Sequence, residues 1–305
     1  MITLYHQPVL LEACVSGMQP QRGGVYVDCT FGGGGHSRTL LQQLGPNDRL
    51  IAFDQDPEAH LNRLHDGRFT LVPRNFRHLA DTLRELDALP VTAILADLGV
   101  SSHQFDSPTR GFSYRFDEEL DMRMDPTQAF TAVDLLATYP REELTRVFRE
   151  LGELPKAWEM AGDILTWRQH QPLRTPRQLE EALHRRIPRQ DRYSWLSRLY
   201  QALRIEVNDE INALKALIQQ SLEVQDEGGR LVVISYHSLE DRLVKHHFAS
   251  GNFEGEVPKD FFGNPLSPWR PVTRKPIVPE PEELTQNPRS RSAKLRIAEK
   301  NTPRT

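Results

Sequence analysis

Four consecutive glycines, Gly32 to Gly35, come shortly after the apolar run VYVD, which begins at Val25. Residues without a side chain let the backbone turn sharply and approach a bound molecule closely, and four together carry a large conformational entropy cost. A glycine-rich turn between a first strand and the next helix is typical of parallel α/β sheets that bind nucleotide-like ligands. The glycines therefore predict such a sheet, and a tight turn without a ligand is the alternative that they leave open.

Short apolar runs bounded by turn residues recur along the N-terminal third of the chain, and each predicts a buried strand. After VYVD these runs are LIAF at Leu50, FTLV at Phe69 and AILAD at Ala93. The stretches between them carry helical patterns, at 37–44, 57–64 and 78–86. Strands that alternate with helices build a parallel sheet with right-handed crossovers, so we expect a doubly wound α/β fold.

The chain then leaves this alternation for a long stretch. The next buried strand, RLVVIS, begins only at Arg230, 133 positions after Asp97, whereas a crossover between parallel strands needs about a dozen residues. The stretch 102–204 has mostly helical patterns, so we interpret it as an inserted helical domain. Residues 1–101 and 205–305 are then predicted to form the two parts of the sheet domain.

The C-terminal part adds further elements. One amphipathic helix with apolar positions from Ile205 to Leu222 is predicted before RLVVIS, and a second helix, opened by the capping-box-like SLED at Ser238, is predicted through Phe248. The segment 265–281 contains six prolines and is predicted to be extended and irregular. AKLRIA, which begins at Ala293, is the predicted last strand.

Two carboxylates accompany the glycine turn. Asp28 ends the first strand, and Asp54 ends the second, 19 positions after Gly35, where a carboxylate can accept both hydroxyl hydrogens of an adenosine ribose. NAD and S-adenosylmethionine both fit this arrangement. The dinucleotide fingerprint GxGxxG is incomplete because Ser37 occupies its third glycine position, which favours S-adenosylmethionine. A helix N-cap before Pro57 is the structural alternative for Asp54.

Asp97 ends the fourth strand, beside the point at which the strand order of a doubly wound sheet reverses, so its carboxylate is predicted to face a ligand. A sulfonium already activates its methyl group, and the protein mainly has to align the acceptor with it. If the acceptor is a base amine, Asp97 can hold its N–H groups and help to localise the nitrogen lone pair. The same carboxylate can instead orient only the cofactor, and the residues leave both roles open.

The chain carries eight motifs in order: HQPVLL at His6, FGGGGHS at Phe31, DLGVSS at Asp97, RGFSYR at Arg110, LDMRMD at Leu120, ALRIEVNDE at Ala202, ISYHSLEDRLVK at Ile234 and NPRSRSAKLRIAEK at Asn287. Over essentially its whole length it resembles the bacterial RsmH (MraW) family. The resemblance implies a class I S-adenosylmethionine-dependent methyltransferase with an inserted helical substrate-recognition domain. The family methylates the N4 amine of a cytidine in the decoding centre of 16S rRNA, within the small ribosomal subunit.

By the same resemblance, the cofactor-binding residues are Gly34, Gly35, His36, Asp54, Phe76, Asp97 and Gln104. Phe76 is expected to lie against the adenine, with an ordinary core aromatic as the alternative. His36 has no second metal ligand at a useful spacing, so no metal site is expected.

Two stretches are candidates for contact with RNA. The segment 174–204 holds eight arginines against three acidic residues and interleaves Tyr193, Trp195 and Tyr200; it predicts an RNA surface, or alternatively a solvated helical face whose aromatics lie in the core. RGFSYR supplies the second stretch, in which Phe112 is the expected stacking partner of an unstacked base. Its candidate substrate-binding residues are Arg110, Phe112, Tyr114 and Arg115.

Composition limits the remaining options. A net charge of −4 excludes a uniformly basic nucleic-acid coat. Cys14 and Cys29 form no metal-binding or paired pattern, which indicates a reducing compartment, and no stretch approaches the roughly 20 apolar residues of a membrane span. We expect a cytoplasmic protein without membrane contact, and a homodimer stays open. A ribosome-assembly module without catalysis and a nicotinamide oxidoreductase are the rival functions.

Overall fold

The computed structural model describes residues 8–259, 261–263 and 266–301. His6 and Gln7 of HQPVLL, and Pro265 of the proline-rich segment, lie outside the described residues. The chain divides into two compact units, Met1–Gly99 with Asn212–Thr305, and Val100–Ile211. We call them the sheet unit and the helical unit. The boundaries that we expected at 102 and 204 both lie within the helical unit.

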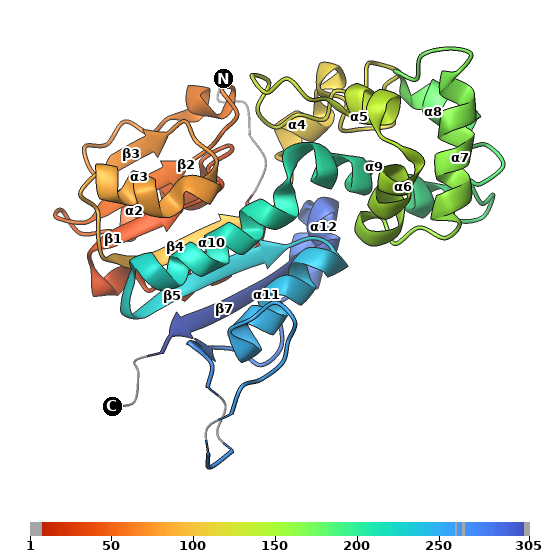
Figure 1. Cartoon of the computed structure of the whole chain (residues 1–305). Helices are drawn as coiled ribbons and strands as arrows, with labels where there is room; N and C mark the ends of the chain where they lie inside the picture. The colour runs from red at the N-terminus through yellow and green to blue at the C-terminus, as the bar shows by residue number, and fades with distance from the viewer. Residues whose placement is uncertain (1–7, 260, 264–265, 302–305) are drawn as a thin grey trace. The chain divides into compact units, whose positions relative to one another are not determined.

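The described residues of the sheet unit form one seven-stranded sheet in the order β3-β2-β1-β4-β5-β7-β6 (Figure 1). Its strands are β1 (Val25–Asp28), β2 (Arg49–Phe53), β3 (Phe69–Val72), β4 (Val91–Asp97), β5 (Gln225–Ser235), β6 (Trp269–Pro271) and β7 (Lys294–Lys300). Strands β1 to β5 run parallel, whereas β7 runs antiparallel to both of its neighbours. This is the sheet of the class I methyltransferase fold, so the predicted fold class is confirmed.

The strand order brings three carboxylates to one edge of the sheet. β1 lies between β2 and β4, and Asp28 pairs in register with Ala52 of β2 and Leu95 of β4. The chain leaves β2 and β4 at the same edge, where Asp54 and Asp97 follow or end these strands. The strand order reverses between β1 and β4, and ligands of doubly wound sheets bind outside this edge.

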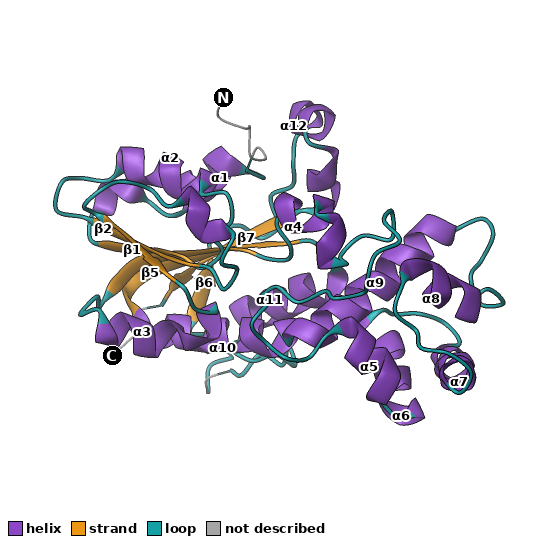
Figure 2. Cartoon of the chain, turned by 90° about the horizontal axis from the view of Figure 1, so that it is seen from above, coloured by secondary structure: helices purple, strands orange, loops and turns teal. Residues whose placement is uncertain are grey.

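Helices cover both faces of the sheet, as Figure 2 shows. Leu40 and Leu41 of α2 pack with strand residues such as Leu50, whereas Leu79 and Leu83 of α3 pack with residues such as Ile51. Successive strand residues thus alternate between two cores, and burying each such side chain contributes about 1.5–3 kcal/mol. One face carries α1 (Leu11–Gly17) and α2 (Gly35–Gln43); the other carries α3 (Leu79–Glu85), α10 (Glu210–Val224) and α11 (Ser238–Ser250).

Two predicted helices differ in the structure. The stretch 57–64 forms only a short 3-10 helix, Ala59–Asn62; Leu61 is 86% exposed, and of the apolar side chains in this stretch Ala59 and Leu64 pack against the core. The single helix predicted from Ile205 to Leu222 is two helices, α9 (Arg192–Asn208) and α10. Asp209 separates them with φ of 51°, a left-handed conformation that ends an α-helix.

Two details of the C-terminal part also differ. The N-cap of α11 is His237, whose side chain accepts the N–H of Glu240, so Ser238 is the first helical residue rather than the cap. The described part of the proline-rich segment is not wholly irregular, because Trp269–Pro271 forms the edge strand β6 against β7. A short helix, α12 (Pro281–Gln286), follows, and its Glu283 accepts the N–H of Leu10 at 2.8 Å.

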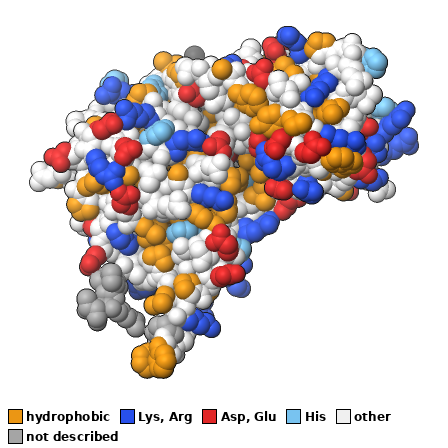
Figure 3. Space-filling view, viewed as in Figure 1, with side chains coloured by type: hydrophobic (Ala, Val, Ile, Leu, Met, Phe, Trp, Pro, Cys, Tyr) orange, Lys and Arg blue, Asp and Glu red, His pale blue; other side chains and the backbone are white. Residues whose placement is uncertain are grey.

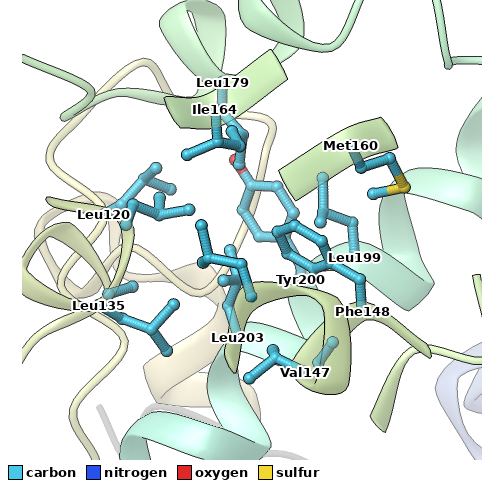
Figure 4. Packing of buried hydrophobic residues seen from close by; sticks show 14 of the residues in the cluster. Leu120, Leu135, Val147, Phe148, Met160, Ile164, Leu179, Leu199, Tyr200 and Leu203 are labelled. Atoms are coloured by element: carbon cyan, nitrogen blue, oxygen red, sulfur yellow. The ribbon is translucent and has the colours of Figure 1, made fainter. Parts of the chain in front are cut away.

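The helical unit has a core of its own, in which Phe148, Tyr200 and Leu203 pack among leucines from several helices (Figure 4). Reciprocal capping boxes begin three of its helices, at Ser101, Thr131 and Thr175, and each satisfies two backbone N–H groups. Besides α9, the helices are α4 (Ser102–Asp106), α5 (Ala132–Thr138), α6 (Arg141–Arg146), α7 (Ala157–Arg168) and α8 (Pro176–Ala182).

Candidate functional site

The glycine turn after β1 is tightly built. Gly32 and Gly34 have φ of 50° and 73°, which side-chain-bearing residues rarely adopt. A Cβ on Gly34 would lie 2.8 Å from the ring of Phe31, and a Cβ on Gly35 would lie 2.2 Å from Pro8. The N–H of Gly34 donates to the carbonyl of Phe31 at 2.7 Å. The turn therefore requires glycine at 34 and 35 for its own packing.

Asp54 joins the end of β2 to this turn. Its Oδ2 accepts the N–H of Gly32 at 2.8 Å, and its Oδ1 accepts the N–H of Asp56 at 2.9 Å. Burial raises the pKa of Asp54 to about 6, although both hydrogen bonds favour the charged form. Each carboxylate oxygen still has a second lone pair, so Asp54 can accept the two hydroxyl hydrogens of a ribose.

Asp28, the last residue of β1, accepts hydrogen bonds from both sides of the glycine turn. Ser37, in the first turn of α2, donates its hydroxyl to Oδ2 of Asp28 at 2.6 Å, and the N–H of Thr30 donates to Oδ1 at 3.1 Å. Only 1% of Asp28 is exposed, and burial raises its pKa. Both oxygens thus bind the protein, and Asp28 fixes the start of α2.

Asp97, at the end of β4, lies next to the side chains of Tyr236 and His36. The hydroxyl of Tyr236 donates to its Oδ1 at 2.8 Å, and Nδ1 of His36 lies 4.0 Å from its Oδ2. His36 directs its other nitrogen, Nε2–H, to the carbonyl of Val9 at 3.0 Å. Burial raises the pKa of Asp97 to about 6, which His36 and Tyr236 oppose.

Phe76 follows β3 at the same edge. It begins the 3-10 helix Phe76–His78 and is partly buried against the core. The preceding Asn75 donates its side-chain amide to Gln55 at 2.9 Å, which ties this turn to the residue after Asp54. The two loops that a bound adenosine would contact are therefore joined.

The charges at this edge favour a cationic ligand over a pyrophosphate. A pyrophosphate binds to free backbone N–H groups of a glycine turn, but here Gly32 donates to Asp54 and Gly34 donates to Phe31. The strongest ionic influences on Asp97 come from His36, Asp28 and Glu240, so acidic groups outnumber basic ones. These features suit the positive charge of a sulfonium.

The other predicted site residues belong to the helical unit. Gln104 is buried, and its side chain accepts the N–H of Ser101 at 3.0 Å within a capping box. Arg110 and Phe112 are only 8% and 5% exposed; the guanidinium of Arg110 donates to the carbonyl of Met124 at 3.0 Å. These two side chains are part of the core of their unit, which corrects the expectation that Phe112 is available to stack on a base.

Tyr114 and Arg115 lie closer to solvent than Phe112. The ring of Tyr114 stacks on that of Tyr193 with 6.5 Å between centroids and 28° between planes, and Tyr193 is 69% exposed. By contrast, Trp195 and Tyr200 are buried. The aromatic residues of 174–204 therefore divide between the surface and the core.

The arginines of 174–204 divide in the same way. Figure 3 shows Lys and Arg side chains on the part of the helical unit around α7 and α8. Six of the eight are held by the protein: Arg174, Arg177, Arg186, Arg192 and Arg204 form ion pairs, and Arg198 donates to a carbonyl. Arg185 and Arg189 are exposed, and no ion pair ties them to another described residue. They are the arginines that are most available to a phosphate.

Sequence reasoning missed Tyr236 and Thr30. Tyr236 follows the last residue of β5 and donates to Asp97, and the hydroxyl of Thr30 accepts the backbone N–H of Asp97 at 2.7 Å. Both residues come just after the end of a strand, which is the sequence signal that identified Asp54.

Among the described residues, no three His, Cys, Asp or Glu side chains are grouped as metal ligands. Within the same residues, the helices are too short or too polar to cross a membrane.

Comparisons with known proteins agree over almost the whole chain. Residues 3–301 match the MraW methylase family. Ribosomal RNA small subunit methyltransferase H of Flavobacterium johnsoniae is 52% identical over 296 residues, which cover 97% of this chain and 98% of that protein. The protein of the same name from Bacteroides fragilis is 50% identical over 298 residues, with 98% of each chain covered.

Proposed function

The chain belongs to the MraW methylase family, and on this premise we propose that it methylates N4 of a cytidine in the decoding centre of 16S ribosomal RNA. The observation that carries the proposal is the 52% identity with a ribosomal RNA small subunit methyltransferase H across 97% of the chain. Family membership also counts against both rival functions, a ribosome-assembly module without catalysis and a nicotinamide oxidoreductase, because the family is one of methylases. The proposed place of action is the cytoplasm, where small ribosomal subunits are found.

The carboxyl edge of the sheet unit would hold S-adenosylmethionine, which supplies an activated methyl group when bound. Asp54 accepts the ribose hydroxyls, and Phe76 lies against the adenine. The turn at Gly34 and Gly35 would bring backbone close to the ligand, and His36 and Asp97 would face its sulfonium. Gln104 is a further proposed contact, on the ground of the family resemblance alone.

Asp97 is the proposed catalytic residue. Its Oδ2 accepts an N–H of the cytidine amine, which lowers the conjugation of the nitrogen lone pair with the ring. The amine nitrogen attacks the methyl carbon, an N–C bond forms, and the electron pair of the broken S–C bond stays on sulfur. One amine proton then leaves to Oδ2 of Asp97 or to water, so charge and atoms balance.

The helical unit is the proposed rRNA-binding unit. Tyr193 is largely exposed and backed by Tyr114, so its ring offers a flat surface to an unstacked base. Arg185 and Arg189, together with Arg115, can contact phosphates. Arg110 and Phe112 support these residues from the core.

The test is methyl transfer to a defined substrate. The protein is incubated with S-adenosylmethionine labelled in the methyl group and with small ribosomal subunits that lack the modification, and the rRNA is digested to nucleosides. We expect label in N4-methylcytidine, and none with Asp97→Ala. Label on another nucleoside, or none with a wild-type protein that binds S-adenosylmethionine, would contradict the proposal.

A further inference from the structure

We propose that Tyr236 is a positioning residue of the methyl-transfer reaction: its hydroxyl holds one oxygen of Asp97 so that the other oxygen is presented to the acceptor amine. This inference rests on the proposed function of Asp97. It assigns a role to a residue that lies in the sheet unit, just after β5.

The backbone of Tyr236 is held from α11. Its N–H donates to Oε2 of Glu240 at 3.0 Å, and Glu240 is only 3% exposed. Oε1 of Glu240 lies 3.1 Å from Nε2 of His237, the N-cap of the helix. A chain of contacts thus runs from the start of α11 through the backbone and hydroxyl of Tyr236 to Asp97, and the side chain of Tyr236 is partly buried against the core.

The two oxygens of Asp97 have different surroundings. Oδ1 accepts the hydroxyl of Tyr236 at 2.8 Å. Oδ2 has His36 Nδ1 at 4.0 Å, beyond hydrogen-bond distance, and the side chain keeps 23% of its surface exposed. Among the described residues, the tyrosine is therefore the hydrogen-bond donor that sets how the carboxylate is rotated, and it leaves Oδ2 for a ligand.

A phenol is well suited to this task. It lowers the free energy of the carboxylate without adding a net charge, whereas a lysine or arginine there would oppose a sulfonium. Burial and Asp97 both raise the pKa of Tyr236, so the phenol stays protonated and donates throughout the working pH range. The same hydrogen bond lowers the pKa of Asp97.

Several other groups act on the charge of Asp97. Glu240 and Asp28 raise its pKa, and His36 lowers it. The thiol of Cys14, from α1, is buried with a raised pKa and stays neutral. The elements around Asp97 thus supply a histidine on α2, an aspartate on β1, a glutamate on α11, a thiol on α1 and the phenol after β5.

The test compares pH profiles of Tyr236→Phe and the wild type. Since the carboxylate must be ionised to hold the amine, the rate of transfer falls on the acid side with the pKa of Asp97. Loss of a hydrogen bond to a charged group moves that acid limb up by about one to two pH units. Well above the limb the rate of the variant stays below that of the wild type, because the ionised carboxylate is no longer held in one orientation, and the affinity for S-adenosylmethionine is unchanged. Tyr139→Phe is the matched control, because Tyr139 also donates to a carboxylate, that of Glu206 in the helical unit. We expect the acid side of the pH–rate profile of this variant to match that of the wild type.

A second variant and a second measurement test the role of Tyr236 independently. If Tyr236→Phe does not fold, 3-fluorotyrosine at 236 replaces it; its more acidic hydroxyl donates more strongly and moves the limb to lower pH. Carbon-13 NMR titration of labelled Asp97 reports the same shifts without turnover. An unmoved limb and an unmoved Asp97 titration in the variants overturn the role of Tyr236. Absence of N4-methylcytidine in the wild type overturns the proposed function instead, and the NMR titration then still decides whether Tyr236 controls Asp97.

Discussion

The carboxylate of Asp54 accepts the backbone N–H of Gly32 at 2.8 Å, so the end of β2 holds the glycine turn that follows β1. The remaining lone pairs of the same carboxylate are free to accept ribose hydroxyls. One residue therefore serves both the shape of the turn and the binding of the ligand.

Replacement of Asp54 weakens binding of S-adenosylmethionine. The hydrogen bonds to the two ribose hydroxyls contribute about 1.5–3 kcal/mol each, so we expect Asp54→Ala to lower the affinity roughly 100-fold or more. Asp54→Asn keeps one acceptor oxygen, so we expect its affinity to lie between that of Asp54→Ala and that of the wild type. Isothermal titration measures the affinities, with Asp81→Ala, which changes a residue whose side chain is 76% exposed, as the control. Equal affinity of Asp54→Ala and the wild type would show that Asp54 does not contact the ligand.

Gly34→Ala destabilises the sheet unit. An alanine at φ of 73° is strained, and its Cβ would lie 2.8 Å from Phe31, which together cost on the order of 2–4 kcal/mol. Gly67→Ala is the matched control, because nothing lies within 4 Å of a Cβ there. Denaturant unfolding of the two variants separates the effects. Similar midpoints would mean that the turn relaxes easily.

Asp97→Asn stabilises the protein at neutral pH. The pKa of Asp97 is raised from 3.8 to about 6, so the folded chain binds more protons than the unfolded chain between these values, and its stability falls as pH rises through that window. Above pH 6 the buried charge costs on the order of 1–3 kcal/mol, which asparagine removes. We expect a higher melting temperature at pH 7.5 and no advantage near pH 4, with Asp81→Asn unchanged at both. A variant that is less stable at pH 7.5 would contradict this account.

Arg185→Ala with Arg189→Ala weakens binding to rRNA through the loss of phosphate contacts. Each contact that is lost lowers the slope of log affinity against log salt by about 1, so the double variant has a slope smaller by about 1 to 2. Filter binding to small subunits over a salt series measures it. Arg149→Ala, which removes an exposed arginine paired with Glu150 elsewhere in the helical unit, keeps the wild-type slope. A slope that does not change would place the RNA on another face.

Local patterns predicted much of the sheet unit. Strand period and turn residues are properties of short segments, so LIAF, AILAD and their end carboxylates Asp54 and Asp97 could be identified directly. Tyr236 likewise comes directly after a strand, RLVVIS, but a tyrosine at such a position does not by itself predict a role in binding or catalysis. Its role becomes visible only when the fold brings it to Asp97.

Long-range packing explains the expectations that failed. Phe112 of RGFSYR was expected to stack on a base, yet the core of the helical unit encloses it, and the carbonyls of Arg123 and Met124 accept hydrogen bonds from the guanidinium of Arg110. The helix break at Asp209 comes next to Asn208, whose side chain bonds to the backbone of Met122 and Met124, 86 and 84 positions away. Neither set of contacts could be predicted from the pattern of neighbouring residues in the sequence.

Calorimetric titration of the purified protein with S-adenosylmethionine, and separately with NAD, tests the central claim most directly. Because the amides of Gly32 and Gly34 are already bonded within the protein and the groups around Asp97 are mainly acidic, we predict one-to-one binding of S-adenosylmethionine and no heat with NAD. Heat with NAD, or none with S-adenosylmethionine or its demethylated product, would contradict the assignment of this edge of the sheet as the methyl-donor site.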